Sequence, residues 1–178
     1  IGFMDSLGIE SAYFNGISMG GAITQYLAVH YPERVRSIIL TNTFPKCCVS
    51  FRRAIEILRE ACGQLDGVTF GRLGQWMIFA QPFQETDENY LLNAELTDMA
   101  YLYPMPGYAY KAQCNAILNF NILDELPGIK VPTLVVGGDK DLFVPVDNQS
   151  HVRCYPRCKT LSSSERWACT TLGAARKI

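Results

Sequence analysis

A serine between two glycines offers the clearest chemistry in this sequence. Gly16, Ser18 and Gly20 form the pattern Gly-x-Ser-x-Gly. When this pattern lies on a sharp turn between a strand and a helix, the serine hydroxyl projects above the sheet and can act as a nucleophile. The N–H of Met19 would then lie at a helix start, where free N–H groups and the helix dipole favour a developing oxyanion. The pattern therefore predicts nucleophilic catalysis by Ser18.

The flanking residues predict the elements that this turn requires. Residues 11–15 form a short run with Tyr and Phe that is typical of a strand. Apolar residues then recur at helical spacing until Pro32, so we expect a helix that opens at Ser18. A Cβ at Gly16 or Gly20 should collide with the neighbouring strand or helix. The alternative is a glycine-rich turn with an incidental serine.

Candidate acids follow a later predicted strand. Residues 132–138 form an apolar run that begins with proline, and Asp139 and Asp141 come directly after it. Parallel α/β sheets place their functional groups beyond the carboxyl ends of the strands. An aspartate there could orient a histidine and stabilise its protonated form. The alternative is a turn aspartate that bonds to its own backbone.

Four segments together resemble the α/β-hydrolase superfamily, and most closely its esterase, enol-lactonase and C–C-bond hydrolase branch. They are residues 7–9, 14–21, 31–35 and 38–42, and the similarity extends to about residue 161. The resemblance implies a partial α/β-hydrolase fold, with a mostly parallel sheet flanked by helices. It also implies a core formed by residues 1–44 and 119–178, with residues 45–118 as a helical cap insertion.

The resemblance assigns roles to the candidate residues. Ser18 would attack a small apolar ester or lactone, the Met19 N–H would bind the oxyanion, and no cofactor or metal is implied. Asp141 lies a few residues before Pro145, as the family's acid does, so it is preferred over Asp139. Family members are longer, and we expect the missing front to hold sheet strands and a second oxyanion donor. A sheet edge left open in this way invites self-association.

The catalytic histidine is the part of the family pattern that the sequence lacks. It should follow the next strand, predicted at residues 159–161, roughly 25 to 30 residues after the acid. The residues after that strand contain no histidine. His30 lies at the far end of the predicted Ser18 helix, and we interpret it as structural. His151 lies on the expected intervening helix and is poorly placed to act as the base.

The C-terminal tail also changes in composition. Residues 149–178 hold six Lys or Arg against one Glu, a net charge of +5, which leaves −6 for residues 1–148. Our hypothesis is that the chain departs from its family after about Leu161, through a frameshift, an altered exon or a sequencing error. The alternative is a genuine, diverged basic tail. The missing histidine also supports a second functional reading, a catalytically inactive chain that binds a ligand or a protein.

Composition narrows the remaining possibilities. The 178 residues carry a net charge of −1, which favours neither nucleic acid nor an anionic membrane as a partner. The sequence shows no signal peptide and no apolar run long enough to span a membrane. The seven cysteines lack the spacing of a zinc site and are expected to be free thiols in a reducing cytoplasm.

Overall fold

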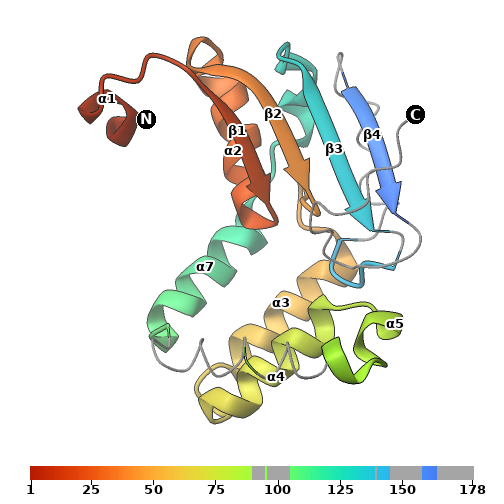
Figure 1. Ribbon diagram of the computed structural model, residues 1–178. Helices are drawn as coiled ribbons and strands as arrows, with labels where there is room; N and C mark the ends of the chain where they lie inside the picture. Colours follow the sequence, from red (N-terminus) through yellow and green to blue (C-terminus); the bar gives the residue numbers. More distant parts are fainter. Residues whose placement is uncertain (90–94, 96–104, 139, 145–157, 164–178) are drawn as a thin grey trace.

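The sheet consists of four parallel strands in the order β1-β2-β3-β4 (Figure 1). They are β1 (Ala12–Ile17), β2 (Val35–Thr41), β3 (Thr133–Gly138) and β4 (Cys158–Ser163). The computed structural model describes residues 1–89, 95, 105–138, 140–144 and 158–163. All four strands were predicted from the sequence, with ends that differ by a few residues. The structure therefore confirms the predicted parallel sheet.

Helix α2 (Met19–His30) follows β1 directly and covers one face of the sheet (Figure 1). Ahead of β1, the sequence predicts a helix that ends at Leu7 with Gly8 as its stop signal. The short helix α1 (Gly2–Ser6) is capped by Leu7, and Gly8 follows with a φ of 67°, the left-handed backbone that favours glycine. Tyr31 caps α2, and the 3-10 turn η1 (Pro32–Arg34) leads into β2. The strand, turn and helix predicted around Ser18 are thus present in that order.

Aliphatic side chains from α2, β2 and β3 form the core on this face, together with the 3-10 turn η2 (Leu123–Gly128). Leu40, Leu126 and Ile129 are fully buried there. The other face is less well covered, since Arg36 is exposed and Ile39 only half-buried. The nearly continuous, β-branched run at residues 35–43 predicts a parallel strand that is buried on both faces. In the structure this prediction holds for the α2 face of β2 alone.

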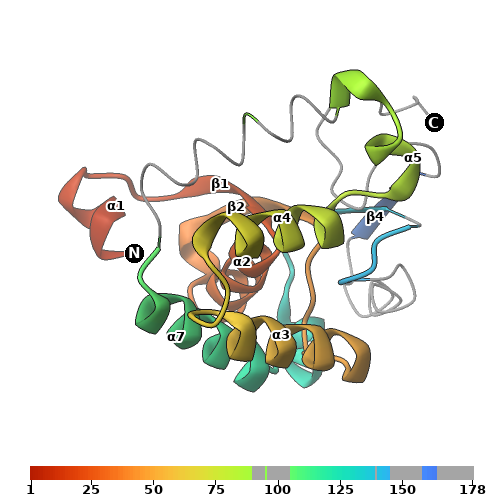
Figure 2. The same cartoon turned by 90° about the horizontal axis from the view of Figure 1, so that it is seen from below.

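The chain between β2 and β3 is helical. It comprises α3 (Val49–Ala61), α4 (Gly67–Ile78), α5 (Gln81–Gln84) and α7 (Gly107–Asn119). Seen along the strands, α3, α4 and α7 lie across the carboxyl end of the sheet (Figures 1 and 2). The segment leaves and rejoins the core at one point, where Lys46 pairs with Asn121 and the Ile122 N–H donates to Pro45 O at 2.9 Å.

Two predicted features of this segment lie wholly or partly outside the described residues. Thr86, followed by two acidic residues, predicts a helix start, and the structure is helical at residues 87–89 before the first described stretch ends. The sequence also predicts an aromatic loop at 101–107, which is described only from Met105. Helical spacing of apolar residues predicts further helices around Phe51 and Leu73, and residues 108–120 are predicted as another. These three predicted helices correspond to α3, α4 and α7. None of the described helices is long and apolar enough to cross a membrane.

Candidate active site

Ser18 lies at the hinge between β1 and α2. Its φ of 51° and ψ of −121° lie in a region that residues with a Cβ rarely adopt, so the turn is strained. The Ser18 N–H donates to Thr41 O at 3.0 Å, and the Ser18 carbonyl accepts from Thr43 Oγ1 at 2.6 Å. Ser18 itself is exposed. The bonds to β2 hold the strained backbone in place and leave the residue open to solvent.

Gly16 and Gly21 leave room for this turn. A Cβ on Gly16 would lie 2.5 Å from Gly20 O and from Thr24 Oγ1, as predicted. The matching prediction for Gly20 is wrong, because a Cβ there would meet nothing described within 4 Å. The crowded position in the first turn of α2 is Gly21, where a Cβ would lie 2.5 Å from the Thr43 side chain. Gly20 contributes its carbonyl to the close approach.

Asp141 lies beyond the end of β3 and is 7% exposed. Its Oδ1 accepts from the N–H groups of Phe143 (2.9 Å) and Val144 (2.8 Å), so it caps its own turn, as the structural alternative predicts. Its Oδ2 accepts from Asn42 Nδ2 at 2.7 Å. Burial raises the pKa of this carboxyl to about 6, although the three hydrogen bonds act to lower it. Asp139 lies outside the described residues.

The parallel register brings these two loops to the same edge of the sheet. Ile17 is paired with Thr41, and Thr41 with Val136, so the segments that follow the three strands begin side by side. Asn42 and Thr43 follow β2 in the middle of this edge and reach both neighbours, Asp141 and Ser18. Sequence reasoning missed both residues, although polar side chains directly after a buried strand were the signal that could have identified them.

The two histidines are placed differently. His30 ends α2, and twelve residues of helix carry it about 18 Å along the axis from Ser18. There its Nε2 lies 3.3 Å from Glu125 Oε2, and its ring packs on Tyr26 at a centroid distance of 4.1 Å. These contacts agree with the structural role predicted for it. His151 lies outside the described residues.

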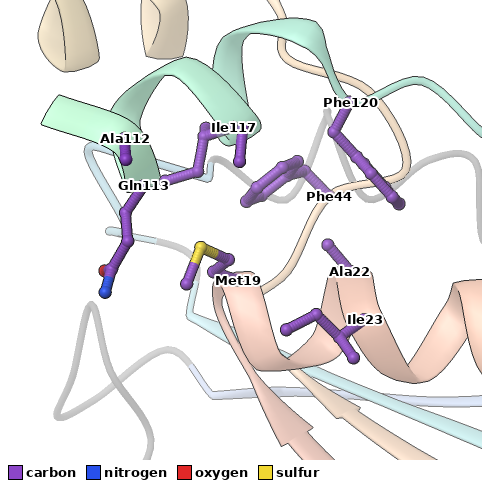
Figure 3. A pocket seen from close by; sticks show the side chains of 9 residues that line it. Met19, Ala22, Ile23, Phe44, Ala112, Gln113, Ile117 and Phe120 are labelled. Carbon is purple, nitrogen blue, oxygen red and sulfur yellow. The ribbon is translucent and has the colours of Figure 1, made fainter. Parts of the chain in front are cut away.

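An apolar cavity of about 380 Å³ opens beside the Ser18 turn, between α2 and α7 (Figure 3). Met19, Ala22 and Ile23 line it from α2, and Phe44 and Phe120 close one side. Gln113 is the one polar residue among the nine that line it. Within the described part of the chain, no cluster of three or more His, Cys, Asp or Glu side chains could hold a metal ion.

Comparison with known proteins identifies the family to which this fold belongs. The sequence profile of the alpha/beta hydrolase fold family matches residues 2–167, and the chain belongs to this family. It is 27% identical over 158 residues to 3-oxoadipate enol-lactonase 1 of Acinetobacter baylyi, a match that covers 85% of this chain and 56% of that protein.

A second curated relative and a solved structure also match the chain. A 2-hydroxy-6-oxo-6-phenylhexa-2,4-dienoate hydrolase of Comamonas testosteroni is 28% identical, with 83% of this chain and 52% of the relative covered. The chain thus spans about half the length of the curated relatives it matches. The enol-lactonase structure from Burkholderia xenovorans LB400 superposes with a TM-score of 0.81 at 23% identity, over 94% of this chain and 62% of that one. This last likeness supports the fold.

Proposed function

We propose that this chain is part of a serine hydrolase that cleaves small, largely apolar esters or lactones. The observation that carries the proposal is the strained, exposed Ser18 at the hinge between β1 and α2. A strained backbone at such a turn persists where function requires it. The buried carboxylate of Asp141 on the same edge of the sheet supplies the acid that such a site needs.

The proposed reaction divides hydrolysis into two steps. Ser18 Oγ attacks the acyl carbon while a base takes its proton, and the Met19 N–H at the start of α2 binds the oxyanion. The proton passes to the leaving alcohol, and water then releases the acid from the acyl-enzyme. Asp141 would orient the base and stabilise its protonated form. Among the described residues, no histidine is placed to act as that base.

The cavity between α2 and α7 supports the proposed substrate class. Its lining is apolar apart from Gln113, and Met19 borders it directly after the nucleophile (Figure 3). We propose that residues 45–118 form a cap that shapes this space, since pockets rather than folds set specificity. The relatives include an enol-lactonase and a 2-hydroxy-6-oxo-6-phenylhexa-2,4-dienoate hydrolase, and cleavage of a carbon–carbon bond is the second candidate reaction for this site.

A fluorophosphonate probe tests the nucleophile because it labels activated serines. We expect labelling of the unchanged protein that disappears in Ser18→Ala. Ser50→Ala is the matched control, since Ser50 is also an exposed serine at a helix start, in α3, but lies on unstrained backbone. Equal, negligible labelling of the unchanged protein and Ser18→Ala would instead favour the second reading, a catalytically inactive chain that binds a ligand or a protein.

We also propose a reducing, cytoplasmic location and self-association through β1. Cys47, Cys62 and Cys114 are free thiols, as expected in a reducing compartment. In the described sheet β1 pairs with β2 alone, and Tyr13 on it is 73% exposed. Sedimentation should show association that weakens in Tyr13→Lys and persists in Tyr108→Lys, a control on α7 where the tyrosine is 80% exposed. Identical sedimentation of all three would contradict this interface.

A further inference from the structure

Asn42 has an unusual backbone and a buried side chain at the carboxyl end of β2. Its φ of 44° lies in the left-handed region, which asparagine tolerates better than most residues. The residue is 5% exposed, and its backbone N–H donates to Val136 O at 2.9 Å. Its Nδ2 donates to Asp141 Oδ2 at 2.7 Å. Glycine would fit this backbone but would lose that donor, and aspartate would place two carboxylates together.

Thr43, the next residue, contacts the opposite neighbour. Its Oγ1 donates to Ser18 O at 2.6 Å, and its side chain fills the space that a Cβ on Gly21 would need. The Ser18 carbonyl also accepts from the N–H groups of Gly21 and Ala22 in the first turn of α2. Two consecutive side chains therefore reach two different loops, Asn42 toward Asp141 and Thr43 toward Ser18.

We propose that Asn42 is a positioning residue that fixes the carboxylate of Asp141 from the end of β2, while Thr43 fixes the Ser18 turn. The inference deepens the proposed hydrolase site and rests on it only for the consequence in catalysis. With Oδ1 held by two backbone N–H groups and Oδ2 by Asn42, the carboxylate cannot rotate. Counting only the bonds made by described residues, one direction at Oδ2 is left to which a base could bond.

The charge of Asp141 makes the contact measurable without any catalysis. The described groups that bond this carboxyl are all neutral: two backbone amides and the side chain of Asn42. Each hydrogen bond stabilises the ionised form and opposes the effect of burial on the pKa. Removing the Asn42 donor should therefore raise the pKa of Asp141 further, because burial would act against one fewer bond.

Carbon-13 NMR of the carboxyl groups in the full chain tests this, with the Asp141 signal assigned from Asp141→Asn. Asn42→Gly keeps the left-handed backbone accessible and removes the amide. We expect its Asp141 to titrate about one pH unit higher, a tenfold change in acid dissociation constant. Asn119→Gly, the same change at the end of α7, should leave the titration unchanged. An unchanged Asp141 midpoint in Asn42→Gly would overturn the inference.

Two further measurements keep the proposal testable if Asn42→Gly does not fold. In the unchanged protein, the Asn42 Nδ2 protons should shift with the same midpoint as the Asp141 carboxyl; protons that do not respond would contradict the contact. Thr43→Val should speed amide exchange at Gly21 and Ala22 about tenfold, and Thr133→Val, which removes a hydroxyl of similar burial at the start of β3, should not. Equal exchange in both would refute the role of Thr43.

These readouts separate the inference from the proposed function. If the carboxyl titration shifts but the fluorophosphonate never labels Ser18, the positioning role stands and the hydrolase proposal fails. If the unchanged protein is labelled, Asn42→Gly should lower the labelling rate about tenfold relative to Asn119→Gly. Labelling that is equal in these two variants, with an unshifted titration, would remove Asn42 from the site.

Discussion

The two ends of the parallel sheet differ in what they hold. At the carboxyl ends of β1, β2 and β3, polar side chains are held on strained backbone, with positive φ at Ser18 and Asn42 and a buried carboxyl at Asp141. Toward the amino ends, aliphatic side chains such as Leu126 and Ile129 are fully buried. One end retains unfavourable features that chemistry can use, and the other supplies the stability that holds them.

The largest effect on stability should come from the aliphatic end. Leu126→Ala removes a fully buried side chain from η2 and leaves a cavity, at a cost of about 2–5 kcal/mol in urea unfolding. Leu142→Ala, in the loop beside Asp141, should cost far less because Leu142 is 63% exposed. A larger cost for Leu142→Ala would break the comparison between the two ends.

A pH-dependent effect should come from Asp141. Burial raises its pKa to about 6 in the folded protein, above the 3.8 of an exposed aspartate, so the folded state binds the proton more tightly than the unfolded state. Stability should therefore fall as pH rises from about 4 to about 6, by about 3 kcal/mol from this group. Urea unfolding across that range should show the fall, and Asp141→Asn should remove it.

Asp66 provides a control of opposite sign. Hydrogen bonds from Thr69 lower the pKa of this exposed aspartate, so its contribution to stability is present above the unfolded pKa and is lost as pH falls. Asp66→Asn should therefore lower stability at neutral pH and leave it unchanged in strong acid. Parallel stability curves for the unchanged protein and Asp141→Asn would argue against a buried, titrating carboxyl.

The two glycines of the serine motif offer a smaller, matched test at the polar end. Gly16→Ala places a Cβ 2.5 Å from a backbone oxygen and should cost about 1–3 kcal/mol. Gly20→Ala meets nothing described within 4 Å and replaces a helical glycine, so we expect no loss of stability. Urea unfolding of both variants checks this, and equal losses would mean that Gly20 is crowded too.

Much of the fold could be predicted from local patterns. The apolar runs identified the strands, and Pro32 and Gly8 marked helix ends. The residues that flank Ser18 predicted the succession of strand, turn and helix around it. The residues between Ser18 and Asp141 could not be identified in this way. Asn42 and Thr43 matter through bonds to residues 99 and 25 positions away, which arise only when three strands are in register. Likewise, only packing distinguishes Gly16 from Gly20.

The smallest expected effect concerns His30, which tests whether chemistry is confined to the carboxyl end. Helix α2 begins at the strained turn and ends at this histidine, which pairs with Glu125 across the surface. Exposed ion pairs contribute little, so His30→Ala should cost about 1 kcal/mol or less in urea unfolding. Fluorophosphonate labelling should be unchanged, because about 18 Å of helix separates the imidazole from Ser18. Labelling lost in His30→Ala but kept in Glu125→Gln would place the base at the wrong end of the helix, and the division between a chemical and a stabilising end would not hold.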